Sequence, residues 1–162
     1  LRDASASATV VDMNATLRRA LERFDAASSN ITIEGDLPPA MGHAPWLVEV
    51  FANLINNALK YTPPDRTPAI TVRGIMQDKH VRYEVSDNGV GIAPEDQQRI
   101  FEMFTRLQSD DQSGQKGLGI GLSIVQRSIQ RLGGEVGVTS VLNKGSTFWF
   151  TLSAPTETHV VV

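Results

Sequence analysis

Apolar residues repeat with helical spacing in several parts of the chain, most clearly after Pro45. Pro45 suits the first turn of a helix, and proline cannot continue one, so this helix should end at Thr62-Pro63-Pro64. Its apolar residues would share one face: Leu47, Val50, Phe51, Leu54, Ile55, Ala58 and Leu59. Weaker patterns predict helices over residues 12–28 and 122–132, and a short helix over 94–101.

Apolar residues that alternate with polar ones, or cluster between turn residues, predict the strands. They are expected over residues 30–34, 70–76, 81–86, 135–141 and 146–153. Asp78-Lys79 and Asn143-Lys144-Gly145 predict hairpin turns, and residues 35–42 predict a turn-rich connection. This order predicts an α+β two-layer sandwich, with a mixed, mostly antiparallel sheet of about five strands and about three helices on one face.

Polar segments interrupt and flank this pattern. Residues 105–116 have almost no apolar side chain and are predicted to form a long loop, a kind of segment that often acts as a lid. The domain is expected to span residues 10–153, with a frayed tail over 154–162. Because the sequence begins with Leu1 rather than Met, we interpret the chain as a fragment and residues 1–9 as the remnant of a linker.

Composition narrows the class of protein. The 162 residues, 41% of them apolar, suffice for one folded domain with a core. A net charge of −3 without basic runs argues against a nucleic-acid binder. The chain has no Cys, which excludes disulfides, and no apolar stretch approaches the roughly 20 residues that span a membrane. A cytoplasmic location is expected.

Asn53, Asn57 and Lys60 share a stripe of the long helix opposite its apolar face. Asn is a mediocre helix former, so two aligned Asn residues at the helix centre need a reason. An Asn oxygen can ligate Mg²⁺, and a Lys ammonium group can meet a phosphate. A solvated polar face is the alternative interpretation.

Two glycine-rich clusters follow. Asp87-Asn88-Gly89-Val90-Gly91-Ile92 comes directly after a predicted strand, where Asp87 could accept a hydrogen bond from an exocyclic amine; a plain Asp-Asn-Gly turn is the alternative. Gly117-Leu118-Gly119-Ile120-Gly121-Leu122 leads from the polar loop into a helix, where free N–H groups favour a polyphosphate. This third polar cluster, residues 117–122, matches neither the P-loop nor the dinucleotide fingerprint.

In this order the three clusters resemble the ATP-binding domain, or Bergerat fold, of sensor histidine kinases, type II topoisomerases, Hsp90 chaperones and MutL proteins. Residues 53–62 resemble the histidine kinase N box, residues 144–150 its G3 segment, and Phe101-Glu-Met-Phe104 its F box, which would anchor the lid. The resemblance covers about residues 10–153 and implies the catalytic domain of a sensor histidine kinase, with ATP and Mg²⁺ as cofactors.

The resemblance implies roles for matching residues. Asn57 would ligate Mg²⁺, and Asp87 would accept a hydrogen bond from the adenine amino group. Gly91 would leave room for the base, and Thr147 would help bind adenine. The implied ATP-binding set is Asn53, Asn57, Lys60, Tyr61, Asp87, Gly89, Gly91, Ile92, Phe104, Gly117, Leu118, Gly119, Gly121, Leu122 and Thr147. The implied catalytic set is Asn53, Lys60, Arg106 and Lys116, although many relatives have Gly in place of Lys116.

Asn53 separates the branches of the family. In the topoisomerase, chaperone and MutL relatives a Glu occupies this place and activates the attacking water, which Asn cannot do as a base. The implied activity is therefore transfer of the γ-phosphoryl group to a histidine, and onward to a response-regulator aspartate, rather than hydrolysis. Glu49, one turn earlier, is interpreted as a surface or helper residue.

The phosphorylated histidine is expected on a separate dimerisation hairpin, because His43, His80 and His159 resemble turn or surface residues. The fragment is thus expected to bind ATP or ADP as a monomer and not to autophosphorylate. Its expected partners are its own histidine domain and a response regulator, with no nucleic acid and no direct membrane contact. The alternatives are a hydrolytic ATPase, a serine-directed kinase of the anti-sigma-factor type, and a non-enzymatic regulatory module.

Overall fold

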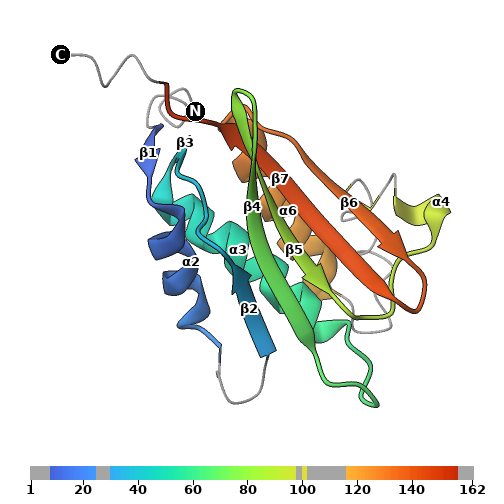
Figure 1. Ribbon diagram of the computed structural model, residues 1–162. Helices are drawn as coiled ribbons and strands as arrows, with labels where there is room; N and C mark the ends of the chain where they lie inside the picture. Colours follow the sequence, from blue (N-terminus) through green and yellow to red (C-terminus); the bar gives the residue numbers. More distant parts are fainter. Residues whose placement is uncertain (1–7, 25–29, 98–99, 102–115, 157–162) are drawn as a thin grey trace.

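The computed structural model describes residues 8–24, 30–97, 100–101 and 116–156, without the side chains of 116–120. These residues form a five-stranded sheet with helices packed on one face and a small two-stranded sheet beside them (Figure 1). The predicted two-layer α+β architecture is confirmed.

The main sheet has the strand order β2-β4-β5-β7-β6, in which the β2–β4 pair is parallel and the other pairs are antiparallel. Its strands are β2 (Asn30–Glu34), β4 (Ala69–Gln77), β5 (His80–Asp87), β6 (Val136–Val141) and β7 (Gly145–Ser153). The small sheet pairs β1 (Thr9–Val11) with β3 (Ala40–Gly42). The helices are α2 (Met13–Leu21), α3 (Ala44–Lys60), α4 (Pro94–Gln97) and α6 (Lys116–Arg131).

The core lies between the sheet and helices α3 and α6. Alternate residues of β5 and β7 face it in register, so that Tyr83 pairs with Phe150 and Val85 with Phe148. Tyr83 and Phe150 stack with ring centroids 5.2 Å apart, and Phe51 of α3 meets Phe150 edge-on at 5.6 Å. This aromatic contact joins the long helix to the centre of the sheet, since such pairs add to the burial of apolar area.

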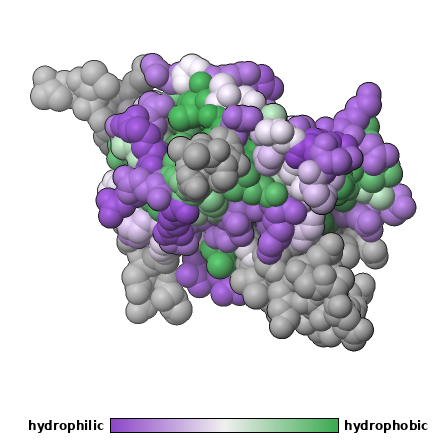
Figure 2. Space-filling view, turned by 90° about the horizontal axis from the view of Figure 1, so that it is seen from below, coloured by the Kyte–Doolittle hydropathy of each residue, from purple (hydrophilic) through white to green (hydrophobic). Residues whose placement is uncertain are grey.

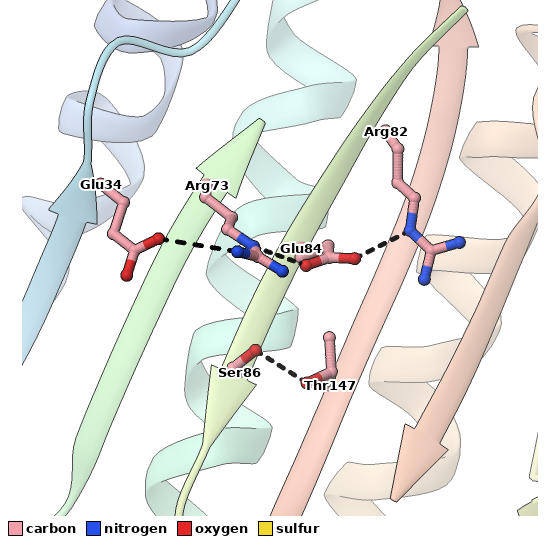
Figure 3. Close-up of polar contacts among 6 residues, drawn as sticks. All are labelled: Glu34, Arg73, Arg82, Glu84, Ser86 and Thr147. Atoms are coloured by element: carbon pink, nitrogen blue, oxygen red, sulfur yellow. Dashed lines mark hydrogen bonds and ion pairs between the residues drawn. The ribbon is translucent and has the colours of Figure 1, made fainter. Parts of the chain in front are cut away.

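The opposite face of the sheet carries a row of charges (Figure 3). Glu84 of β5 accepts hydrogen bonds from Nε of Arg73 at 2.8 Å and from Nε of Arg82 at 2.9 Å. The Cζ atom of Arg82 lies 4.3 Å from the ring centroid of Trp149. Burial alone would raise the pKa of Glu84, but the hydrogen bonds from Arg73 and Arg82 outweigh burial and hold this pKa below its usual value. The row links neighbouring strands on the face opposite the described helices α3 and α6.

Both predicted hairpins are confirmed, with positive φ at Asp78 (60°) and Asn143 (67°) in their turns. Other predictions need correction. The predicted turn-rich segment 35–42 ends in β3, which pairs with β1, a strand that begins at Thr9, the last residue of the predicted linker. Local periodicity cannot reveal such a long-range pairing. Helix α4 ends at Gln97, short of the predicted residue 101, and α2 ends at Leu21, while residues 25–28 lie outside the described ranges.

The largest correction concerns α6, which begins at Lys116 rather than near Leu122. All three glycines of the third cluster therefore lie within the helix rather than in a loop before it. In the described part of the chain, no helix combines the length and the apolar character that crossing a membrane requires.

Candidate functional site

Three backbone segments meet at one end of the molecule: the end of α3, the loop after β5, and the β6–β7 hairpin. The N–H of Val90 donates to the carbonyl of Tyr61 at 3.1 Å, and the N–H of Asn143 donates to the carbonyl of Val90 at 2.7 Å. Residues that are far apart in the sequence are thus fixed against one another. Figure 2 views the molecule from below and shows mostly hydrophilic residues, with apolar residues exposed between them.

Glycine is required where these backbones touch. A Cβ at Gly89 would lie 2.6 Å from the carbonyl oxygen of Tyr61, and one at Gly145 would lie 2.0 Å from that of Asp87. Gly91 has φ +79°, and a Cβ there would lie 2.3 Å from the carbonyl oxygen of Val141. Any side chain at these positions would separate the segments, so the glycines have a local packing function whatever ligand binds.

Asp87 stands at the end of β5 on the core face of the sheet, two residues beyond Val85. Its Oδ1 accepts hydrogen bonds from the N–H of Gly89 at 2.8 Å and of Ser146 at 3.3 Å. Burial raises the pKa of Asp87 above its usual value, although these two backbone donors act in the opposite direction. Among the described residues no group donates to Oδ2, which is therefore available to a ligand.

The sheet register separates Ser146 from Thr147. Asp87 pairs with Ser146, so their side chains share the core face, whereas Thr147 pairs with Ser86. The hydroxyl groups of Thr147 and Ser86 lie 2.8 Å apart on the outer face (Figure 3). The structure therefore places the predicted site residue Thr147 on the face away from Asp87. Ser146, which the sequence analysis did not single out, is the hydroxyl residue beside it.

Asn57 is buried within α3, with 3% of its surface exposed. Its Nδ2 atom is buried and has no hydrogen-bond partner among the described residues. A buried amide without a partner is costly, and a ligand that engages it would remove this cost. The amide group thus fits an ion or a phosphate: its oxygen can ligate Mg²⁺, and its nitrogen can donate to a phosphate oxygen.

No group of three His, Cys, Asp or Glu residues that could hold a metal ion occurs within the described ranges. Asn57, whose amide oxygen can ligate Mg²⁺, is the residue of this site that could hold a cation. Lys60, one turn further along α3, is exposed, and Tyr61 is half-buried at the end of the helix. They stand three and four residues after Asn57, and so within about one helical turn of it.

Asn53 faces helix α6. Its Nδ2 donates to the carbonyl of Glu49 at 2.8 Å, and its Oδ1 would be 3.0 Å from a Cβ at Gly121. Gly121 therefore permits the close approach of α6 to α3 at this point. The carboxylate of Glu49 is held by Arg23 of the segment after α2, and hydrogen bonding from Arg23 lowers the pKa of Glu49. Glu49 is an ion-paired surface residue, as expected.

Residues of the loop between α3 and β4 hold the Asp87 loop in place, and the sequence offered no signal for this role. Arg66 donates through Nη1 to the carbonyls of Asn88 at 2.5 Å and Gly89 at 3.1 Å. In return, the Asn88 side chain accepts from the N–H of Ala69 at 2.9 Å and donates to the carbonyl of Thr67 at 3.0 Å. The two loops are thus tied together in both directions.

The other predicted residues fall into two groups. Three of them are described. The N–H of half-buried Ile92 donates a hydrogen bond to Ser140 Oγ, and Leu122 is buried in the core. The ring of Phe101 meets that of Phe148 edge-on, with ring centroids 6.2 Å apart. Phe104, Arg106, His159 and residues 105–115 lie outside the described residues, as do the side chains of Lys116 and Leu118. His43 precedes α3, and His80 begins β5 beside the hairpin turn, as predicted.

This geometry of Asn57, Asp87 and the glycine contacts agrees with a comparison against protein families. Residues 42–156 match the model of the histidine kinase-, DNA gyrase B- and HSP90-like ATPases. The chain belongs to this family. Its relatives identify it further as a histidine kinase ATP-binding catalytic domain, as the resemblance of its motifs implied.

Relatives of this histidine kinase domain include sensory kinases of several bacteria. It is 41% identical over 121 residues to the adaptive-response sensory kinase SasA of Synechococcus elongatus, covering 74% of the chain and 30% of the relative. It is 34% identical over 156 residues to the sensor-like histidine kinase SenX3 of Mycobacterium tuberculosis, covering 93% of the chain and 38% of the relative. The chain therefore spans about a third of the length of these kinases.

Solved structures of histidine kinases have the same fold. The mycobacterial sensor histidine kinase MprB superposes with a TM-score of 0.73 at 27% identity, covering 92% of this chain and 99% of that one. Full-length ShkA in complex with AMPPNP superposes with a TM-score of 0.73 at 29% identity, covering 92% of this chain and 32% of that one. The domain thus corresponds to a whole structural unit in one case and to part of a longer kinase in the other.

Asp87→Asn should stabilise the domain near pH 7. Because burial raises the pKa of Asp87 in the folded state, the folded protein binds more protons than the unfolded chain, and stability falls as pH rises through that window. Asn removes the buried charge, so the melting temperature should rise near neutral pH. The gain should shrink toward about pH 3, below the unfolded pKa. Exposed Asp36→Asn is the control, and equal effects of the two substitutions would contradict this expectation.

Arg66→Ala should destabilise the domain by about 1–3 kcal/mol, because two partly buried carbonyls would lose a charged donor. Urea unfolding measures the free-energy difference. Exposed Arg18→Ala, which removes a similar side chain from the surface of α2, should change the free energy of unfolding by less than about 0.5 kcal/mol. If both variants unfold at the same urea concentration, Arg66 does not hold the loop.

Proposed function

We propose that this domain binds ATP with Mg²⁺ and transfers the γ-phosphoryl group to a histidine on a separate domain of the same kinase. The phosphoryl group would then pass to an aspartate of a response regulator. The observation that carries this proposal is the buried Asn57 amide without a partner on the same helix as Tyr61, whose backbone holds the Asp87 loop. An adenine site and a phosphate site are thereby joined by one rigid element.

The adenine end would be formed by Asp87 and Ser146. Oδ2 of Asp87 would accept a hydrogen bond from the 6-amino group of the base, and Ser146 lies beside Asp87 on the same face of the sheet. Tyr61, half-buried at the end of α3, would border the base. Ser146 takes the place that the sequence analysis assigned to Thr147, because only Ser146 shares the face of Asp87.

The phosphate end would lie between α3 and the beginning of α6. Asn57 would hold Mg²⁺, which supplies positive charge to the phosphate oxygens when bound, and Lys60 would add a second charge. The first N–H groups of a helix have no partner within it and favour anions. Because α6 begins at Lys116, these groups belong to residues 116–119, where Gly117 and Gly119 leave the backbone open to a phosphate.

The chemistry would be phosphoryl transfer rather than hydrolysis. Asn53 stands one turn before Asn57 and has no carboxylate to activate water, and the Glu49 carboxylate is occupied by Arg23. Catalysis of this kind depends mainly on positioning and charge stabilisation, which a nucleotide site supplies. The γ-phosphoryl group would therefore persist until an acceptor histidine docks.

Calorimetry of the fragment with ATP, with and without Mg²⁺, tests the nucleotide site. We expect binding that weakens without Mg²⁺ and falls by at least about a hundredfold in Asp87→Asn, because an Asn nitrogen would face the adenine amine. The thermal melt of that variant separates lost binding from lost folding. A folded fragment without affinity for ATP would contradict the proposal.

The acceptor is tested with the full-length kinase. After incubation with ATP labelled on the γ-phosphate, the label on the protein should be lost in acid, as phosphohistidine is. Exposed His80→Gln should leave the label unchanged, because the acceptor histidine is proposed to lie outside this domain. An acid-stable label would instead indicate a serine-directed kinase.

A further inference from the structure

Three hydrogen bonds converge on the hydroxyl of Ser140 near the end of β6. The N–H of Ile92 donates to Ser140 Oγ at 2.7 Å, Ser140 Oγ donates to the carbonyl of Gly145 at 2.8 Å, and the Oγ atoms of Ser140 and Ser146 lie 2.9 Å apart. A serine hydroxyl has one hydrogen and two acceptor lone pairs. Because a carbonyl can only accept, the Gly145 carbonyl takes the single hydrogen of Ser140.

The direction of the third bond follows. Ser140 has no hydrogen left for Ser146, so Ser146 must donate its own hydroxyl hydrogen to Ser140. Ser146 is 7% exposed, and its backbone N–H is already directed to Oδ1 of Asp87. Toward any other neighbour, the Ser146 side chain can therefore act only as an acceptor.

Asp87, the cross-strand neighbour of Ser146, has the same character. An ionised carboxylate accepts hydrogen bonds and cannot donate them. The Asp87 and Ser146 side chains, which share one face of the sheet, thus both act as acceptors. A purine with a 6-amino group offers donors to such a surface, whereas one with a 6-oxo group offers another acceptor, which leaves polar groups unpaired.

We propose that Ser140 is a positioning residue for base specificity. By occupying the hydroxyl hydrogen of Ser146, it prevents that hydroxyl from turning to serve a 6-oxo group. The domain then accepts 6-aminopurine nucleotides and rejects their 6-oxo counterparts more strongly than Asp87 alone would allow. This inference rests on the proposed function, since it concerns the base-binding end of the same site.

The test compares ADP with inosine diphosphate, two nucleotides that differ in the group at position 6 of the base. Calorimetry gives both dissociation constants for the unaltered fragment, Ser140→Ala, Ser140→Thr and Ser86→Ala. Ser140→Ala frees the Ser146 hydroxyl to donate, so the preference for ADP should fall about three- to tenfold. Ser140→Thr keeps a hydroxyl and should retain the preference.

Ser86→Ala is the matched control, because it removes the hydrogen bond between the Ser86 and Thr147 hydroxyl groups, in the same region of the sheet but on its outer face. It should leave the ratio of the two constants unchanged even if both affinities shift. Should Ser140→Ala fail to fold, Ser140→Cys replaces the hydroxyl with a weaker thiol donor, and a fall in the same direction is expected.

The ratio separates positioning from stability, since a merely structural loss weakens both nucleotides alike. A ratio in Ser140→Ala equal to that of the unaltered fragment would overturn the inference, as would an equal fall in Ser140→Thr. Tight binding of both nucleotides by the unaltered fragment would also overturn it while leaving the proposed function intact. Binding of neither would overturn the proposed function and the inference together.

Discussion

Direct contact between backbones holds the site together. The end of α3, the loop after β5 and the β6–β7 hairpin approach so closely that a single Cβ at Gly89, Gly91 or Gly145 would overlap a carbonyl oxygen. Two main-chain hydrogen bonds through Val90 close the junction. Because main chain is less adaptable than side chains, the positions of Tyr61, Asp87 and Ser146 follow from this contact.

The site is also the place where the apolar core gives way to polar groups. Along β5 and β7, Val85 and Phe148 are buried, and the next pair on the same face is Asp87 and Ser146. On α3, Asn57 is likewise a buried polar residue that follows the buried apolar residues Leu54 and Ile55. Burial destabilises the charge of Asp87 and leaves the Asn57 amide without a partner, so the empty domain is less stable than an apolar version of the site would be. A ligand that hydrogen-bonds to both groups would offset this cost.

Local sequence patterns predicted much of this structure, because the signals were themselves local. The apolar face of α3, both hairpin turns and the Asp-x-Gly-x-Gly loop depend on residues near one another in the chain. The pairing of β1 with β3 and the hydrogen bonds from Arg66 to the Asp87 loop depend on long-range contacts, which leave no local pattern in the sequence. The start of α6 was misjudged because three glycines favour a loop by propensity, yet all three lie in the helix, where Gly121 allows the close approach of Asn53 from α3.

Thr147 shows a different limit. The motif pointed to Thr147, but which of two neighbouring hydroxyl groups lies on the face of Asp87 depends on the strand register, and a shift by one residue moves a side chain to the other face. The pairing with β5 puts Ser146, and not Thr147, on the face of Asp87. The Ser140 network likewise became visible once β6, β7 and the Ile92 backbone were placed together.

Hydrogen–deuterium exchange of the fragment with and without ADP and Mg²⁺ tests the central claim, that the backbone junction is the nucleotide site. We expect slower exchange at residues 57–61, 87–92 and 145–146 when ADP is bound, and unchanged exchange in α2, which lies on the far side of α3 from α6. Binding of ADP with protection confined to α2 or the outer face of the sheet would contradict it.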